Sequence, residues 1–334
     1  MKKFNIPVFV PHKGCPYDCV FCNQKRITGN LKETTPTDVK RIIDEHLLTL
    51  PKTNRNIEVA FFGGSFTGIP IDEQSALMEQ VKPYIESGEI DGIRLSTRPD
   101  YITRPILENL KAYGVKTIEL GVQSMVDDVL KASNRGHTSK DVKDAVKLIR
   151  EYGFSLGLQM MTGLPGDTEK HSLTTAKKLI ELKPDFVRIY PTLTIKDTYL
   201  EKIYNKGKYT PQSLDDAVML SKQLLLMFES ANIKVIRIGL QPTDEINDNA
   251  SVVAGPFHSS FGELVESAVY YDIIYNAVSK LSGDVRVYVN PKEISKAVGN
   301  KRSNIIKIKE NTGLNIKITG DLSLKKREVR CTCF

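Results

Sequence analysis

Short apolar runs that alternate with amphipathic stretches constrain the fold of this chain more than any other feature. The runs contain the β-branched and aromatic residues typical of buried strands. They occupy residues 57–64, 92–98, 116–123, 154–161, 185–190 and 234–240. Strands separated by helices predict βαβ units and a parallel sheet. Because the alternation continues for about 240 residues, it predicts an α/β fold with a full or partial (β/α) barrel.

Helix signals and polar residues punctuate this pattern. One helix is predicted to begin at Thr35, a good cap that precedes a proline, and another is predicted after Ser139. The apolar residues expected on their inner faces are Val39, Ile42, Ile43 and Leu47 in the first helix, and Val142, Ala145, Val146 and Ile149 in the second. In a barrel the chemistry lies at the carboxyl ends of the strands. The residues found there are Gly63-Gly64, Ser96-Thr97-Arg98, Gln123 and the loop 163–166.

The five cysteines lie near the two ends of the chain, which does not fit a secreted disulfide framework. Cys15, Cys19 and Cys22 form C-x₃-C-x₂-C. Three thiolates from one loop can converge on one metal centre, and they leave one iron of a four-iron cluster open. The alternative is a structural zinc site, which wants four ligands, with His12 as the fourth. A last pair, Cys331 and Cys333, is interpreted as metal ligands, a redox pair or neither.

The triad, with Phe21 before its third cysteine, resembles the radical S-adenosylmethionine (SAM) superfamily. In that family the amino and carboxylate groups of SAM chelate the open iron of a [4Fe–4S] cluster. One electron then breaks the sulfonium bond, and the resulting 5′-deoxyadenosyl radical abstracts a hydrogen atom from the substrate. The resemblance implies a cluster on Cys15, Cys19 and Cys22, with Phe21 near the adenine of SAM. It also implies an electron donor such as ferredoxin or flavodoxin.

Further motifs extend this resemblance over roughly residues 1–240. FFGGSF places Gly63 and Gly64 where the family binds the SAM amino group, and glycine lets the backbone approach a ligand. STRPDYI, IELGVQS and NRGHT resemble the branch of the Elongator catalytic subunit and, more loosely, the oxygen-independent coproporphyrinogen oxidases. Matched by position, they imply SAM contacts from Ser96, Gln123 and Arg135, with Arg135 suited to the carboxylate. The chain is too short for the acetyltransferase domain of the Elongator subunit, so none is expected.

The C-terminal part has a different character. From Leu281 to Phe334 there are twelve Lys or Arg against five Asp or Glu, an excess equal to the net charge of +7 of the whole chain. We expect a barrel over 1–240, a connecting loop and helix over 241–280, and a small basic α+β module over 281–334. The module resembles a degenerate KH-type RNA-binding module, whose GXXG loop clamps nucleotides. A small basic cap on the barrel is the alternative.

The loop of this KH-like module would be Gly299-Asn300-Lys301-Arg302, in which Arg302 replaces the second glycine. Lys301 and Arg302 are therefore expected to pair with phosphates of an RNA. The histidine of GPFH, His258, follows the predicted barrel and is a candidate substrate residue.

These features favour a radical SAM enzyme that modifies RNA, with tRNA as the expected substrate. Two alternatives stay open: a radical SAM enzyme that acts on a small molecule such as a tetrapyrrole, and a non-enzymatic iron–sulfur sensor that binds RNA. The chain contains 40% hydrophobic and 26% charged residues, with no membrane-spanning run and no signal peptide. A cytoplasmic location without a membrane partner is therefore expected.

Overall fold

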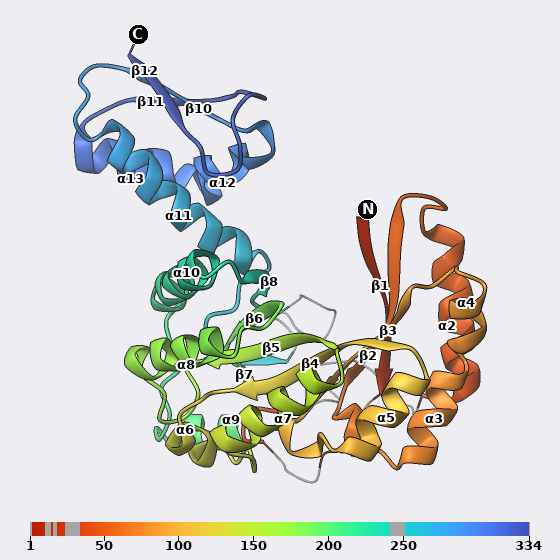
Figure 1. The fold of residues 1–334 in the computed structure, drawn as a ribbon. Coiled ribbons are helices and arrows are strands. Elements are labelled where there is room, and N and C mark those ends of the chain that lie inside the picture. The colour runs from red at the N-terminus through yellow and green to blue at the C-terminus, as the bar shows by residue number, and fades with distance from the viewer. Residues whose placement is uncertain (1, 11–14, 16–18, 24–33, 241–250, 334) are drawn as a thin grey trace.

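The structure is a computed structural model that describes residues 2–10, 15, 19–23, 34–240 and 251–333. Within these residues, seven parallel strands form one open, curled sheet (Figure 1). In their order across the sheet they are β1 (Lys2–Val10), β2 (Arg55–Gly63), β3 (Gly92–Thr97), β4 (Val115–Gln123), β5 (Ser155–Thr162), β6 (Phe186–Pro191) and β8 (Lys234–Ile238). The predicted α/β fold is confirmed, and the barrel is a partial one.

Helices connect these strands. They are α2 (Pro36–Thr49), α3 (Ile71–Glu79), α4 (Lys82–Glu86), α5 (Arg104–Ala112), α6 (Asp127–Ala132), α7 (Ser139–Glu151), α8 (Glu169–Glu181), α9 (Tyr199–Asn205) and α10 (Leu214–Ser230), with 3₁₀ turns η1 (Phe66–Gly68) and η2 (Pro99–Tyr101). Across the described ranges, no helix is both long and apolar enough to cross a bilayer. Strand β1 was not predicted, because Lys2, Lys3 and Asn5 interrupt its hydrophobic pattern.

The predicted helix starts are confirmed, and local side chains explain them. Thr35 accepts a hydrogen bond from the Asp38 N–H (3.3 Å), and the Asp38 carboxylate accepts one from the Thr35 N–H (3.0 Å). Thr138 and Asp141 form the same capping box at the start of α7. Each box satisfies two backbone N–H groups that would otherwise have no partner. The predicted inner face of α7 is buried at all four positions, and that of α2 at three of its four.

The two faces of the sheet differ in chemistry. Alternate residues such as Ile118, Leu120 and Val122 of β4 pack against the helices in one large hydrophobic core. The opposite face contains charges, of which Glu119 is 0% exposed. Its carboxylate accepts hydrogen bonds from Arg188 Nε (2.7 Å) and Nη2 (3.1 Å), and from Gln159 Nε2 (3.1 Å), and it pairs with Arg94 Nη2 (3.0 Å). A buried carboxylate persists because such partners replace water.

Close packing on this inner face requires one glycine. A Cβ at Gly157 would lie 2.4 Å from the Phe186 ring and 3.0 Å from Cγ of Glu119. The Arg94 guanidinium lies 5.3 Å from the centroid of the Phe186 ring, within the range of a cation–π contact. Gly157 therefore leaves room for the aromatic ring and the charged pair to lie side by side.

A second hydrophobic core forms after the curled sheet. Its elements are α11 (Phe261–Val278), β10 (Val285–Val289), η3 (Pro291–Glu293), α12 (Ile294–Val298), η4 (Asn300–Arg302), α13 (Ser303–Thr312), β11 (Ile316–Gly320) and β12 (Arg330–Cys333). Strand β10 pairs with β11 in parallel and with β12 antiparallel. From β10 onward this part therefore runs in the order strand, helix, basic turn, helix and two strands. A short ribbon of β7 (Thr194–Ile195) and β9 (Val252–Ala254) was not predicted.

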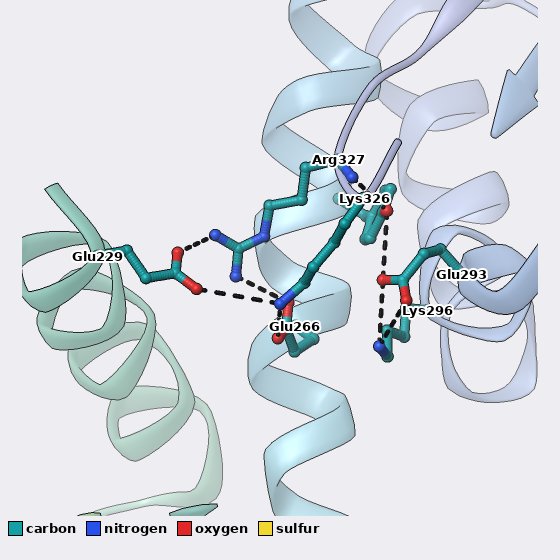
Figure 2. A network of polar contacts seen from close by, with 7 residues as sticks. Glu229, Glu266, Glu293, Lys296, Lys326 and Arg327 are labelled. Atoms are coloured by element: carbon teal, nitrogen blue, oxygen red, sulfur yellow. Dashed lines mark hydrogen bonds and ion pairs between the residues drawn. The ribbon is translucent and has the colours of Figure 1, made fainter. Parts of the chain in front are cut away.

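An ionic network holds this C-terminal part against α10 and α11 (Figure 2). Arg327 donates to Glu266 on α11 (2.8 Å) and to Glu229 on α10, and Lys326 also pairs with Glu266 (2.9 Å). The Arg327 backbone N–H donates to the Tyr270 hydroxyl (2.9 Å). Burial acts to raise the pKa of Glu266, but Arg327 and Lys326 outweigh it and hold that pKa below its usual range. The network links the loop before β12 to two helices of the chain.

The buried carboxylate on the inner face leads to a stability prediction. Replacement of Glu119 by Gln leaves Arg94 and Arg188 without their shared counter-charge in a buried site. We expect Glu119→Gln to lower the free energy of unfolding by about 3–5 kcal/mol. Glu151→Gln, in the exposed pair of Arg104 and Glu151, is the matched control and should cost less than about 1 kcal/mol. Denaturant unfolding followed by circular dichroism measures both, and equal losses would contradict the prediction.

Candidate functional site

The cysteine triad follows β1 and is held at the carboxyl edge of the sheet by backbone hydrogen bonds. The Val20 N–H donates to the carbonyl of Ser133 (3.1 Å), and the Leu200 N–H donates to the carbonyl of Val20 (2.7 Å). The Cys22 N–H closes a turn onto the carbonyl of Cys19 (2.9 Å). These contacts join the triad to the segment after α6 and to the start of α9. His12, the alternative fourth ligand, lies outside the described residues.

Cys15 is anchored by the loop after β2. The Ser65 backbone N–H donates to its sulfur. The residue as a whole is exposed, but its sulfur lies among neighbouring groups. This burial raises the pKa of the Cys15 thiol, while the positive charges of Arg135 and Arg98 and the Ser65 N–H act to lower it. The site thus provides positive charge and an N–H donor for an anionic sulfur.

Arg135 and Cys19 are brought into direct contact. Nη1 of Arg135 donates to the Cys19 sulfur (3.4 Å), and Nη2 donates to the carbonyl of Gly121 (2.7 Å). A Cβ at Gly121 would lie 2.9 Å from Arg135 Nη2 and 3.1 Å from Gln123 Nε2. The missing side chain of Gly121 therefore lets Arg135 and Gln123 lie beside the same strand end. Arg135 is 7% exposed, and its Nε has no hydrogen-bond partner among the described residues.

Gln123 has an unusual backbone. Its φ of 66° lies in the left-handed region, and the pairing of β4 with β5 shifts register between Gly121 and Gln123. Such bulges re-aim a side chain and are common beside functional sites. Its buried Oε1 has no hydrogen-bond partner within the described ranges. A buried amide oxygen without a partner fits a site that binds a polar ligand.

The other residues expected to contact SAM line the same edge of the sheet. Gly63 has a φ of 112°, and a Cβ there would lie 2.9 Å from the carbonyl oxygen of Val10, to which the Gly64 N–H donates (3.0 Å). Ser96 accepts a hydrogen bond from Gln159 Nε2 (3.4 Å) on the inner face. Phe21 is half-buried beside Cys22.

Two more residues belong to this site. Arg98 was expected at the carboxyl end of its strand without a specific role, and His137 is the histidine of the NRGHT motif, for which no role was predicted. The side chain of Arg98 is 2% exposed and donates to both carboxylate oxygens of Asp100 (3.0 and 2.9 Å). His137 is buried, and its Nε2–H donates to the carbonyl of Val122 (3.2 Å). Burial first, and then the charges of Arg135 and Arg98, lower the pKa of His137 to about 4. Its imidazole is therefore neutral at neutral pH. The signal for Arg98 in the sequence was a charged residue at the end of an apolar strand pattern.

A cavity of about 260 Å³ opens beside the loop after β5. It is lined by Gly163–Thr168 and by Lys208, Tyr209, Thr210 and Gln212. The Tyr209 hydroxyl donates to the carbonyl of Gly163 (2.7 Å), whose φ is 72°. A Cβ at Gly163 would lie 2.7 Å from Oε1 of Gln212. This glycine thus lets the loop and the Gln212 segment approach each other at the rim.

The candidate residues of the C-terminal part lie close to one another in space, although they are far from the triad in the sequence. The amide of Asn300 lies 3.5 Å from Nε2 of His258. Lys301 and Arg302 are exposed and have φ values of 51° and 65°. The loop around His258 packs beside Pro191 and Leu193, at the carboxyl end of β6. The basic turn therefore reaches the same edge of the sheet that the cysteine loop occupies.

The residues present fit an anionic iron–sulfur cluster. Three thiols come from one loop, one accepts a hydrogen bond from a buried guanidinium, and another accepts one from a backbone N–H. Buried polar atoms of Arg135 and Gln123 have no partners within the described residues, which fits a further polar ligand beside the sulfurs. No three His, Cys, Asp or Glu side chains of the described ranges are grouped closely enough to hold a metal ion. The fit therefore rests on the chemistry of the donors and of their surroundings.

Comparison with protein families gives two matches. The radical SAM superfamily matches residues 9–179, and the radical SAM C-terminal domain matches residues 184–271. A solved structure of archaeal Elp3 from Methanocaldococcus infernus shares the fold with a TM-score of 0.65 at 22% identity, covering 81% of this chain and 63% of that one. SuiB of Streptococcus suis, solved with bound SAM, has a TM-score of 0.51 at 15% identity, covering 70% and 50%.

Curated proteins include several relatives of this chain. A tRNA uridine(34) acetyltransferase of Dehalococcoides mccartyi is 30% identical over 46% of this chain and 38% of that protein. Human Elongator complex protein 3 is 34% identical over 41% and 25%. An uncharacterised protein of Methanocaldococcus jannaschii is 30% identical over 66% and 70%. The chain thus spans less than half the length of the first and second of these relatives.

The motifs that resemble the Elongator branch lie within the matched residues, and the partial barrel is the fold of the solved relatives. The chain belongs to the radical SAM superfamily, as an enzyme related to the Elongator catalytic subunit.

Proposed function

We propose that this enzyme cleaves SAM reductively at a [4Fe–4S] cluster and uses the resulting radical to modify RNA, with tRNA as the substrate. The observation that carries the proposal is the contact of Arg135 with Cys19 beside the bulged Gln123. It joins the predicted cluster loop to two predicted SAM residues. The names of the relatives, a tRNA uridine acetyltransferase and Elongator complex protein 3, support an RNA substrate.

In this proposal Cys15, Cys19 and Cys22 hold the cluster. Bound there with SAM, the reduced cluster would supply the electron that cleaves SAM to methionine and a 5′-deoxyadenosyl radical. Arg135 binds and orients the carboxylate of SAM, because its guanidinium can donate two parallel hydrogen bonds. Gln123 is suited to a ribose hydroxyl, since the bulge turns its amide toward the strand end.

The remaining SAM contacts follow the same edge. Gly63 and Gly64 let the backbone approach the amino group of SAM without a side chain between them. Ser96 offers a hydroxyl above the charged inner face, and Phe21 provides an aromatic surface for the adenine. A low-potential protein of the ferredoxin or flavodoxin class would supply the electron.

RNA binding is proposed for the basic turn at residues 299–302. Lys301 and Arg302 present exposed charges from a left-handed backbone, which costs free energy and is retained most often where function requires it. Gly299 is required, because a Cβ there would lie 2.4 Å from Oγ of Ser303. The order of elements around this turn supports a KH-like module over 281–334. His258 lies between the turn and the end of β6, so we propose it as a contact for the substrate.

The cluster and SAM chemistry can be tested together. Reconstituted anaerobically and reduced with dithionite, the wild-type chain should convert SAM to 5′-deoxyadenosine, and Cys19→Ala should reduce this to background. Cys333→Ala, an exposed cysteine outside the triad, should keep the wild-type rate. Product is measured by chromatography with and without total RNA. An intact cluster that yields no 5′-deoxyadenosine in either case would contradict the proposal and favour a sensor.

The proposed RNA site leads to a separate prediction. The double variant Lys301→Gln/Arg302→Gln should bind tRNA more weakly, and the slope of log K against log salt should become shallower by about 0.7–0.9 for each charge lost. Lys143→Gln/Lys147→Gln, two exposed positions on α7, removes the same charge elsewhere. Filter binding between 50 and 200 mM salt, roughly the range over which phosphate contacts are weakened, measures both. Equal slopes for the two double variants would refute this RNA site, and a small-molecule substrate would then be favoured.

A further inference from the structure

Arg98 is a cation enclosed at the end of β3. It is the largest of the fully buried side chains in the described residues, although buried residues are mostly apolar. Its partner Asp100 accepts two parallel hydrogen bonds from it, at 3.0 and 2.9 Å. The carboxylate of Asp100 is itself 22% exposed, so water screens it better than it screens Arg98. The pair thus presents its positive end toward the protein interior.

Arg98 is connected to the cysteine loop through Ser65. The backbone N–H of Arg98 donates to Oγ of Ser65 (3.2 Å), and the backbone N–H of Ser65 donates to the Cys15 sulfur. Two hydrogen bonds therefore connect the backbone of Arg98 to the first cysteine of the triad. The charge of Arg98 also acts on both Cys15 and Cys19. Arg98 follows β3, whereas Arg135 contacts both Cys19 and the Gly121 carbonyl of β4.

Among the residues that the structure describes, the other titratable groups around Arg98 do not cancel its charge. Arg135 adds a second positive charge beside Cys19. His137 is neutral, since its pKa is about 4. Asp100 is the carboxylate that pairs with Arg98 in this region. Among the described residues, these two buried guanidinium groups are accompanied by one carboxylate, which leaves a net positive charge beside Cys15 and Cys19.

We propose that Arg98, held by Asp100, is an electrostatic positioning residue that favours the reduced state of the iron–sulfur cluster. The inference depends on the proposed function, because it requires a cluster on Cys15, Cys19 and Cys22. Reduction adds one electron, from a low-potential donor of the ferredoxin or flavodoxin class, and no bond forms or breaks. The added negative charge is stabilised by a buried positive charge, whose effect is strong where water is excluded. Arg98 thereby raises the reduction potential of the cluster.

Potentiometry tests this directly. Clusters are reconstituted anaerobically, iron and sulfide are counted, and the reduced cluster is followed by electron paramagnetic resonance during a redox titration without SAM. Arg98→Gln should lower the equilibrium constant for one-electron reduction about tenfold, which corresponds to a potential about 59 mV more negative. Asp100→Asn should shift the potential in the opposite direction, because it removes the negative partner and keeps the positive charge.

Two controls separate charge from structure. Arg98→Lys keeps the charge, so its potential should stay close to that of the wild type. Arg104→Gln removes an exposed arginine, whose charge water screens, from its pair with Glu151 and should leave the potential unchanged. If Arg98→Gln fails to fold, as judged by circular dichroism, the upward shift in Asp100→Asn is the required result.

The outcomes distinguish this inference from the proposed function. Opposite shifts in Arg98→Gln and Asp100→Asn, with full iron content, would support it. Equal potentials in all cluster-loaded proteins would overturn the role of Arg98 and leave the radical SAM function intact. A wild-type chain that takes up no cluster would overturn both.

Discussion

Parallel hydrogen bonding from β1 to β8 is the constraint on which the rest of the structure depends. It sends every loop that follows a strand to the same edge of the sheet. The cysteine loop after β1, the glycine loop after β2 and the bulge at Gln123 are therefore neighbours, although more than a hundred residues separate the first from the last. A site made from several short loops can hold a large cofactor because the sheet fixes the distances between them.

The two faces of the sheet carry different kinds of residues. Residues that face the helices form the hydrophobic core, which supplies the folding free energy. Residues on the inner face form a charged layer around Glu119, in which each charge has a counter-charge. The triad region differs: within its described residues, Arg98 and Arg135 contribute two positive charges, and Asp100 contributes one negative charge. Among the described residues, positive and negative charges are balanced on the inner face of the sheet. Positive charge is in excess at the proposed site, as expected where an anionic group binds.

The C-terminal part contacts the rest of the chain at two places. The ionic network of Arg327 fixes the part against α10 and α11 (Figure 2). The contact of Asn300 with His258 directs the basic turn toward the end of β6. Loss of one partner of the first contact would be costly, because it would leave a half-buried charge without its counter-charge. Together they give the turn a defined place relative to the proposed site, which a flexible tail would not have.

The sequence by itself determined the βα alternation, the capped starts of α2 and α7 and the spacing of the triad, because local periodicity and capping chemistry decide these features. It also pointed to Gln123 and Arg135, through a resemblance carried by contiguous motifs. Only the tertiary structure decided that Arg135 contacts Cys19, that β4 bulges at Gln123, that Arg98 is buried and that His258 meets the basic turn. Each of these depends on packing between segments that are distant in the sequence, which local sequence patterns do not reveal. Arg135 and Cys19, for instance, are 116 residues apart.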